Sequence, residues 1–171
     1  MEGLKLDLGC GKNKREGFIG VDSRAFEGVD VVADLTKRWP WDDGSVAEVN
    51  ASHVVEHLDG PERIHFVNEL YRVLQPGGKA TIITPHWCSQ RAYGDMTHKW
   101  PPVSEFWYYY LAKDWRAVNA PHNDGYTCDF AATWGYSLRP DVAIRAQEFQ
   151  FFSMSNHKEA CMDTIATLVK R

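Results

Sequence analysis

Two glycines between two short apolar runs constrain the fold of this chain more than any other feature. Residues 4–8 are typical of a buried strand and run directly into Gly9 and Gly11. Because glycine has no Cβ, backbone at these positions can turn tightly and approach a ligand closely. A second apolar run, residues 18–21, ends at Asp22, whose carboxylate can accept hydrogen bonds from a ribose diol. The pattern predicts a nucleotide-sized pocket between the glycine turn and Asp22.

Dinucleotide-binding sites share this arrangement, and they continue it as Gly-x-Gly-x-x-Gly. In this chain Lys14 occupies the position of the third glycine. A lysine does not allow the close helix packing that the third glycine permits. Hydride chemistry on a dinucleotide is therefore disfavoured.

Polar residues also follow the next two predicted strands. Residues 29–33 lead into Asp34, and residues 46–51 lead into Ser52 and His53. In an open α/β sheet, ligands bind outside the carboxyl ends of the strands. We therefore expect Asp34 and His53 to share one crevice with the glycine turn.

The order of elements predicts an α/β fold with one domain. Pro61 opens a run with apolar residues at helical spacing, which ends before a strand at residues 79–84. We expect a single domain, 1–171: a cofactor-binding half at 1–86, an aromatic-rich acceptor or lid insert at 87–136, and a C-terminal β-hairpin at 137–171. Apolar residues in the tail predict the first strand of that hairpin: Val142, Ala143, Ile144, Ala146, Phe149 and Phe151.

Composition excludes several partners. The net charge of -4 provides no general attraction to nucleic acid or to an anionic membrane. No apolar run approaches the roughly 20 residues of a membrane span, and the first residues lack a secretory pattern. We predict a cytoplasmic protein, monomeric or homodimeric.

The cysteines predict neither a disulfide framework nor a zinc site. No Cys-x-x-Cys pair occurs among Cys10, Cys88, Cys128 and Cys161. One region is rich in ligand-type side chains whose spacings match no zinc pattern: His86, Cys88, His98, His122, Cys128 and Asp129. We therefore expect free thiols and no metal.

Five motifs occur in order, at residues 6–11, 20–22, 33–35, 53–58 and 69–79. Together they resemble class I S-adenosylmethionine-dependent methyltransferases, small members of the methyltransferase type 11 kind. The resemblance covers about half of the chain. It implies a Rossmann-like three-layer sandwich, mainly a parallel sheet of seven strands whose last strand is reversed. It also implies S-adenosylmethionine as cofactor and S-adenosylhomocysteine as product.

The resemblance assigns the cofactor site. It places the glycine turn under the methionine moiety, Asp22 on the ribose hydroxyls, and Asp34 with Leu35 beside the adenine. Asp7 would either orient the glycine turn or meet the methionine ammonium group. The predicted cofactor-binding residues are Asp7, Gly9, Cys10, Gly11, Asp22, Ser23, Asp34, Leu35 and His53.

The chain departs from the family pattern near its start. Eight residues precede Gly9, and the residues between Gly11 and Ile19 are too few for an ordinary crossover helix, so a loop or single turn is expected. Lys12, Lys14 and Arg15 in this loop either face an anionic group of the cofactor or acceptor, or form a solvated basic loop.

Methyl transfer from a sulfonium depends mainly on alignment, so no catalytic residue is obligatory. An acceptor that must lose a proton would gain from a base, and His98 is the best placed candidate, with Asp95 to orient it. Alternatively, Asp95 and Thr97 form a turn and His98 merely packs. Glu56 and His57 either serve the site or cap and pack beneath it.

The aromatic insert predicts where the acceptor binds. Thirteen aromatic residues fall within 87–136, and Tyr93 and Trp107 are the predicted substrate-binding residues. A planar or cationic small molecule suits such rings, although stacking on a nucleobase stays open. We expect methyl transfer to a small-molecule acceptor, with oxygen, nitrogen and carbon all open. The alternative is a non-catalytic S-adenosylmethionine-binding partner or sensor subunit.

Overall fold

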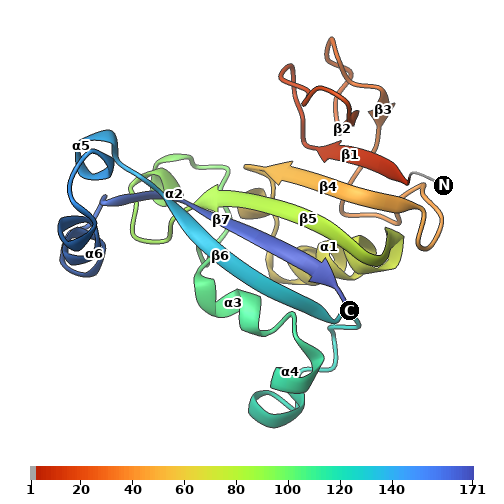
Figure 1. The fold of residues 1–171 in the computed structure, drawn as a ribbon. Coiled ribbons are helices and arrows are strands. Elements are labelled where there is room, and N and C mark those ends of the chain that lie inside the picture. The colour runs from red at the N-terminus through yellow and green to blue at the C-terminus, as the bar shows by residue number, and fades with distance from the viewer. Residues whose placement is uncertain (1–2) are drawn as a thin grey trace.

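Seven strands form one sheet in the computed structural model, which describes residues 3–171 (Figure 1). The strands are β1 (Leu4–Leu8), β2 (Ile19–Asp22), β3 (Val31–Val32), β4 (Val46–Ser52), β5 (Leu74–Pro85), β6 (Phe130–Leu138) and β7 (Cys161–Lys170). Their order across the sheet is β3-β2-β1-β4-β5-β7-β6. The pairs from β3 to β5 are parallel, and β7 is antiparallel to both of its neighbours. The predicted Rossmann-like, mainly parallel sheet with a C-terminal antiparallel hairpin is confirmed.

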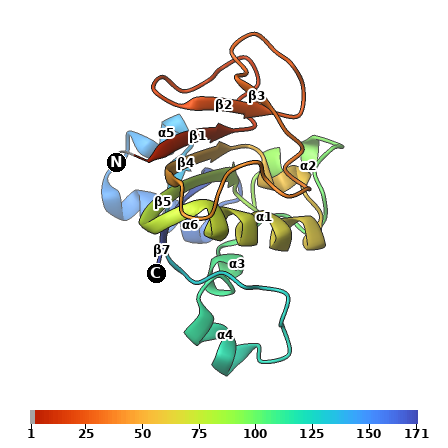
Figure 2. The same ribbon diagram turned by 90° about the vertical axis from the view of Figure 1, so that its right-hand side faces the viewer.

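The helices are mostly short. They are η1 (Val55–His57), α1 (Gly60–Val73), α2 (Arg91–Gly94), α3 (Glu105–Tyr109), α4 (Lys113–Asn119), α5 (Pro140–Ala143) and α6 (Gln147–Asn156). The longest, α1, runs along one face of the sheet, behind it in Figure 1 and beside it in Figure 2. It begins at a capping box in which Asp59 and Glu62 each accept the other's backbone N–H, with Pro61 in its first turn.

The main core lies between α1 and the sheet. Leu6 and Leu8 of β1, Ile82 of β5, and Phe66 and Leu70 of α1 are all fully buried. Alternate residues of each strand face this core, which follows from the two-residue period of a β-strand. The packing fixes the carboxyl ends of β1, β4 and β5 at one edge of the molecule.

An ion pair fastens α1 to the loop that precedes β4. Glu69 accepts a hydrogen bond from the backbone N–H of Trp39 at 2.7 Å and two more from the Arg72 guanidinium, at 2.8 and 2.7 Å. The same guanidinium donates to the carbonyls of Trp39 and Trp41. Glu69 and Arg72 lie within the motif at residues 69–79, so part of that motif serves to hold this loop.

The turn between Gly11 and Ile19 contains no helix among the described residues, as its length predicted. The first strand of the C-terminal hairpin, in contrast, was placed wrongly. It is β6, which lies within the segment assigned to the aromatic insert, whereas α5 and α6 occupy most of 140–156. The tail's apolar residues mimic an alternating strand, but Ile144 and Phe151 are 82% and 59% exposed and belong to no sheet.

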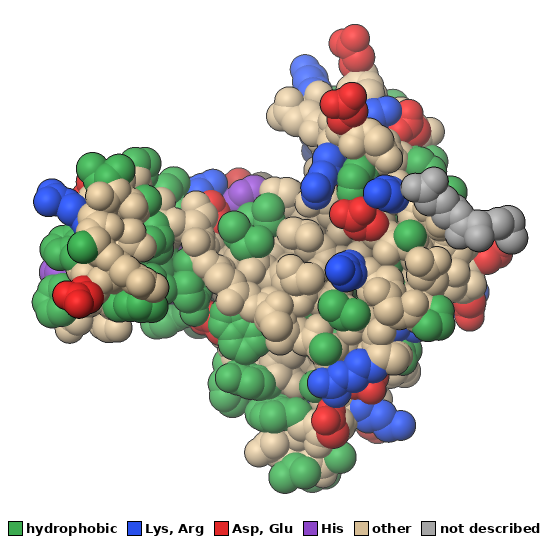
Figure 3. All heavy atoms as spheres, in the orientation of Figure 1, with side chains coloured by type: hydrophobic (Ala, Val, Ile, Leu, Met, Phe, Trp, Pro, Cys, Tyr) green, Lys and Arg blue, Asp and Glu red, His purple; other side chains and the backbone are tan. Residues whose placement is uncertain are grey.

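Hydrophobic side chains gather over α5 and α6 and over the region of α3 and α4 (Figure 3). The surface is hollowed between the loops around β2 and β3 and the C-terminal helices. The carboxyl ends of β1 and β4 open toward this hollow, where the cofactor site is expected. No helix of the described residues has the length and apolar character to cross a membrane.

Candidate functional site

The glycine turn after β1 has the backbone that its sequence predicted. Gly9 and Gly11 have φ angles of +66° and +52°, in the region that favours glycine. A Cβ on Gly9 would lie 2.3 Å from Cγ2 of Val54, whose branched side chain has little freedom to move. A Cβ on Gly11 would meet no atom within 4 Å. The first glycine is therefore required by packing, and the second leaves open space beside the turn.

Two carboxylates hold this turn from opposite sides. Asp22, at the end of β2, accepts the N–H of Gly11 at 2.9 Å and the N–H of Arg24 at 3.1 Å. Asp7 is buried and accepts the N–H of Arg15 at 2.7 Å and the side-chain amide of Asn50 at 2.7 Å. Oδ2 of Asp22 accepts only the N–H of Gly11, so it retains a lone pair and can also accept from a diol.

A cavity of about 640 Å³ opens at this turn. It is lined by Asp7, Gly9, Cys10, Gly11, Lys12, Asn13, Arg15, Asn50, Ser52, His53 and Ile83. Five of the nine predicted cofactor residues are among them: Asp7, Gly9, Cys10, Gly11 and His53. Sequence reasoning missed Asn50, Ser52 and Ile83, although their place on alternate positions near the ends of β4 and β5 was a usable signal.

The other four predicted cofactor residues lie outside the lining of this cavity. Ser23 neighbours Asp22 on the far side of the glycine turn, with its hydroxyl 3.5 Å from the carboxylate. Asp34 is exposed and accepts the N–H and hydroxyl of Thr36, and these two bonds lower the pKa of its carboxyl. Leu35 is buried in the core, so its side chain is less open to a ligand than the side chain of Asp34.

The basic loop divides between two roles. Lys14 pairs with Asp30 at 3.0 Å, and Asp30 also accepts the N–H of Gly20 at 2.7 Å. Lys12 and Arg15 instead line the cavity. Two cations therefore face the space where the resemblance puts the methionine end of the cofactor, and the donor set fits a carboxylate.

His53 adopts a backbone conformation that is uncommon for its residue type, with φ at +58°. Its Nδ1 lies 3.0 Å from Oε1 of the buried Glu56, and its Nε2 lies 4.0 Å from Oδ1 of Asp163. The hydrogen bond with Glu56 raises the pKa of His53, although burial opposes this. The loop after β4 thus points the His53 imidazole into the cavity, and Glu56 holds the ring in place through Nδ1.

The predicted catalytic residues, Asp95 and His98, lie outside the lining of the cofactor cavity. Asp95 accepts both the N–H and the hydroxyl of Thr97, so it forms the turn that was the alternative reading of this segment. His98 stacks edge-on against His57, with ring centroids 4.8 Å apart. Neither Asp95 nor His98 is among the residues that line the cofactor cavity. The structure therefore does not bring His98 directly to the predicted cofactor.

The predicted substrate-binding residues also lie apart. Tyr93 is half exposed and donates its hydroxyl to the carbonyl of Trp87. Trp107 donates its indole N–H to the hydroxyl of Tyr126 and lines a smaller cavity of about 360 Å³. Their aromatic neighbours, rather than these two, surround the larger cavity.

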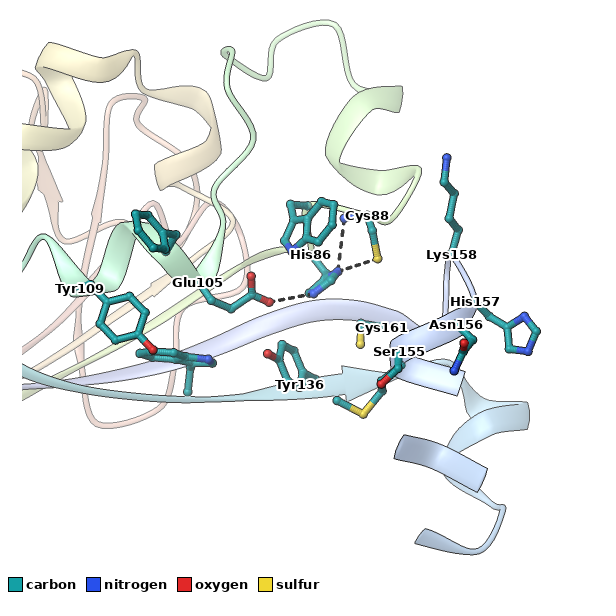
Figure 4. A pocket seen from close by; sticks show the side chains of 14 residues that line it. His86, Cys88, Glu105, Tyr109, Tyr136, Ser155, Asn156, His157, Lys158 and Cys161 are labelled. Atoms are coloured by element: carbon teal, nitrogen blue, oxygen red, sulfur yellow. Dashed lines mark hydrogen bonds and ion pairs between the residues drawn. The ribbon is translucent and has the colours of Figure 1, made fainter. Parts of the chain in front are cut away.

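That larger cavity, about 720 Å³, lies beyond the end of β5 (Figure 4). Aromatic rings make up much of its wall: Trp87, Phe106, Tyr109, Trp134 and Tyr136. Tyr109 lies four residues after Glu105 and three after Phe106, so it shares a face of α3 with both, whereas Tyr108 is buried in the core. This segment therefore contributes aromatic rings both to the core and to a pocket.

A carboxylate lies within this aromatic cavity. Oε1 of Glu105 is 2.9 Å from Nε2 of His86, and Nδ1 of His86 is 3.0 Å from Sγ of Cys88, as the dashed lines in Figure 4 show. Burial opposes ionisation of Glu105, but hydrogen bonds from His86 and from its own backbone N–H outweigh burial and lower its pKa. Burial and the charge of Glu105 raise the pKa of Tyr136 to about 12. Sequence reasoning missed Glu105, whose place at the start of an aromatic helix was the available signal.

Comparisons with known proteins agree with this geometry. A family model described as a methyltransferase domain matches residues 12–82. No curated protein matches the sequence. A methyltransferase from Archaeoglobus fulgidus that depends on S-adenosylmethionine has a TM-score of 0.70 at 19% identity, over 99% of this chain and 86% of that one.

Two other solved structures have the same fold. The Haloferax volcanii putative methyltransferase, solved with its Trm112 activator, has a TM-score of 0.60 at 15% identity over 99% of this chain and 82% of that one. Geranyl diphosphate C-methyltransferase from Streptomyces coelicolor has a TM-score of 0.55 at 17% identity over 99% and 73%. At such identities the structures establish the fold. Together with the family model over residues 12–82, they support a class I S-adenosylmethionine-dependent methyltransferase.

Proposed function

We propose that this enzyme methylates a small molecule that carries an amine, which binds as the ammonium ion and loses a proton before the methyl group is transferred. The observation that carries the proposal is the carboxylate of Glu105 inside a cavity walled by aromatic rings. Rings attract a cation through their π faces, and a carboxylate adds a charge-assisted hydrogen bond. This combination selects for positively charged nitrogen more than for a neutral or anionic acceptor.

The cofactor cavity supports the first half of the reaction. Lys12 and Arg15 would hold the carboxylate of S-adenosylmethionine, and Asp22 would accept from its ribose hydroxyls. The bound cofactor supplies the methyl group as a sulfonium. The glycine turn provides backbone that approaches the ligand without a side chain between them.

Both cavities have wall residues near the carboxyl end of β5. Ile83 lines the cofactor cavity and His86 lines the aromatic cavity, three residues further along the chain. At roughly 3.3 Å per residue in a strand, about 10 Å of backbone separates these two wall residues. A small molecule bound in the aromatic cavity is therefore near the carboxyl ends of the strands, where the cofactor binds in this fold.

Glu105 has a positioning role in this proposal. Its pKa is lowered, so it remains ionised at neutral pH and serves poorly as a base. His86 keeps the carboxylate oriented through their 2.9 Å contact. The bound ammonium group must release one proton to water before the nitrogen lone pair can attack the methyl group, and transfer then gives the methylated ammonium group and S-adenosylhomocysteine. Alignment of the nitrogen by Glu105 can supply much of the rate, so His98 is not needed to accept this proton.

The Streptomyces neighbour is a C-methyltransferase solved with geranyl diphosphate, a small molecule, which supports a small-molecule acceptor on this fold. The Haloferax neighbour was solved with a protein activator, so activation by a partner chain is possible on this fold. The second candidate function is a partner or sensor subunit that binds the cofactor without turnover. Cytoplasmic location and the monomeric or homodimeric state stay predictions.

Labelled methyl transfer separates these candidates. Purified protein is incubated with methyl-labelled S-adenosylmethionine and a panel of small amines, phenols, carboxylic acids, RNA and protein. We expect label in small amines, with Tyr109→Ala raising the KM for the acceptor because the variant removes one ring of the cavity wall. Trp100→Ala is the control, since Trp100 is an exposed ring outside the residues that line this cavity.

Three outcomes would contradict the proposal. Label found only in phenols or acids would contradict the proposal that the acceptor atom is nitrogen. Label found only in RNA or protein would contradict the proposal that the acceptor is a small molecule. Cofactor binding without transfer to any class would favour the binding subunit.

A further inference from the structure

We propose that Glu56, His57 and His98 bind a divalent transition-metal ion, with Zn²⁺ the ion that this donor set fits best. One ligand-type atom from each of the three side chains lies within 4.8 Å of the others. The sequence alone predicted no metal, because residues 56, 57 and 98 come together only through the fold. The site is distinct from both cavities and does not depend on the identity of the acceptor.

Both imidazoles are already oriented as metal ligands are. Nδ1 of His98 lies 3.2 Å from the carbonyl oxygen of Ala92, to which it can donate only as Nδ1–H. Nδ1 of His57 lies 3.0 Å from the hydroxyl of Thr97. That hydroxyl gives its own proton to Asp95 at 2.7 Å, so it accepts from His57.

These bonds fix the tautomer of each ring. With Nδ1 protonated, the lone pair of each neutral imidazole is on Nε2. Metal-binding histidines characteristically donate their other ring N–H to a carbonyl, carboxylate or hydroxyl in this way. The turn at residues 95–97 therefore orients the His57 ring, through the hydroxyl of Thr97.

Glu56 adds an independent observation. Its side chain is 95% buried, and its Oε1 contacts His53, but its Oε2 has no hydrogen-bond partner among the described residues. An unpaired carboxylate oxygen in a buried site is costly. A bound cation removes that cost, because the oxygen then has a ligand.

The donor set determines the class of ion. Two imidazole nitrogens and one carboxylate oxygen suit zinc and similar transition metals better than Ca²⁺ or Mg²⁺, which prefer all-oxygen sites. Oδ2 of Asp95 lies 3.9 Å from Nε2 of His98, near enough to complete a fourth position after a small movement. Such an ion would join the loop after β4 to the segment that leads into α3, and so connect the cofactor half to the acceptor half.

The test uses untagged, chelator-treated protein and measures Zn²⁺ by equilibrium dialysis and Co²⁺ by its visible absorption. We expect one equivalent of Zn²⁺ per chain and a cobalt spectrum of low coordination number. His98→Ala should weaken Zn²⁺ binding by about 100-fold or more. Thr97→Val should weaken it by about 10- to 100-fold, since it removes the hydroxyl that bonds His57 and Asp95 but no metal ligand.

Matched controls exclude other sites and misfolding. His122→Ala replaces an exposed histidine outside the cluster and should bind Zn²⁺ like the wild type. S-adenosylhomocysteine binding and circular dichroism report whether each variant is folded. The proposal is overturned if the wild type binds no stoichiometric Zn²⁺, if His98→Ala and Thr97→Val bind as well as the wild type, or if binding is lost only in Cys88→Ser.

Discussion

Replacing Glu69 by alanine is expected to lower the free energy of unfolding by about 3–5 kcal/mol, the usual cost of removing one partner of a buried ion pair. The variant would leave the Arg72 guanidinium and the N–H of Trp39 without their acceptor. It would also release the loop before β4 from α1. Urea unfolding of the variant and the wild type measures the difference.

The stabilising effect of Glu69 should depend on pH. The hydrogen bonds that Glu69 accepts from Arg72 and from the N–H of Trp39 lower the pKa of its carboxyl, although burial opposes this shift. A carboxyl with a lowered pKa in the folded state stabilises at pH values above its ordinary pKa, and this contribution disappears as pH falls through the folded-state pKa. The difference between Glu69→Ala and the wild type should therefore narrow in acid.

Glu148→Ala is the matched control, because Glu148 is exposed on α6 and its loss should change stability by no more than about 0.5 kcal/mol. A cost for Glu69→Ala no larger than the roughly 1 kcal/mol of a surface ion pair would contradict the assigned role. A difference that widens in acid would contradict it as well.

Replacing Glu105 by glutamine is expected to lower kcat/KM for an amine acceptor by about 10- to 100-fold, the value of one hydrogen bond to a charged group. Glutamine keeps the size of the side chain but removes the charge that faces the aromatic cavity. The loss should appear mainly in KM for the acceptor, since Glu105 binds the nitrogen before and during transfer. Affinity for S-adenosylmethionine should not change.

Steady-state kinetics with Glu148→Gln, the same substitution on an exposed residue, provides the control. If Glu105→Gln leaves KM for the acceptor unchanged, the aromatic cavity is not where the nitrogen binds. His98→Ala could instead lower kcat more than Glu105→Gln does, and abolish a step in the pH profile of kcat that belongs to a base. That result would support the proton-transfer role of His98 that the sequence predicted.

Features encoded by neighbouring residues could be predicted from the sequence. The apolar run at residues 4–8, the glycines that follow it and the proline that opens α1 each act within a few residues. They predicted a mainly parallel sheet and a glycine turn near Asp22, and in the structure Gly11 of that turn donates its N–H to Asp22. Local patterns of this kind need no knowledge of distant contacts.

Features that depend on distant contacts were missed. β6 became a strand because β7 pairs with it, although its residues looked like part of an aromatic insert. Glu105 meets His86 only after α3 packs against β6, and His98 meets His57 only through the turn at residues 95–97. Nothing in the spacing of these residues along the chain predicts such contacts.

Calorimetric titration with S-adenosylmethionine and with S-adenosylhomocysteine tests the central claim most directly. We expect each ligand to bind once per chain, and Asp22→Ala to weaken both by about 10- to 100-fold through loss of charge-assisted hydrogen bonds to the ribose. Asp124→Ala, at an exposed loop position, should bind like the wild type. If the well-folded wild type binds neither ligand, the cofactor assignment is contradicted and the proposed methyl transfer falls with it.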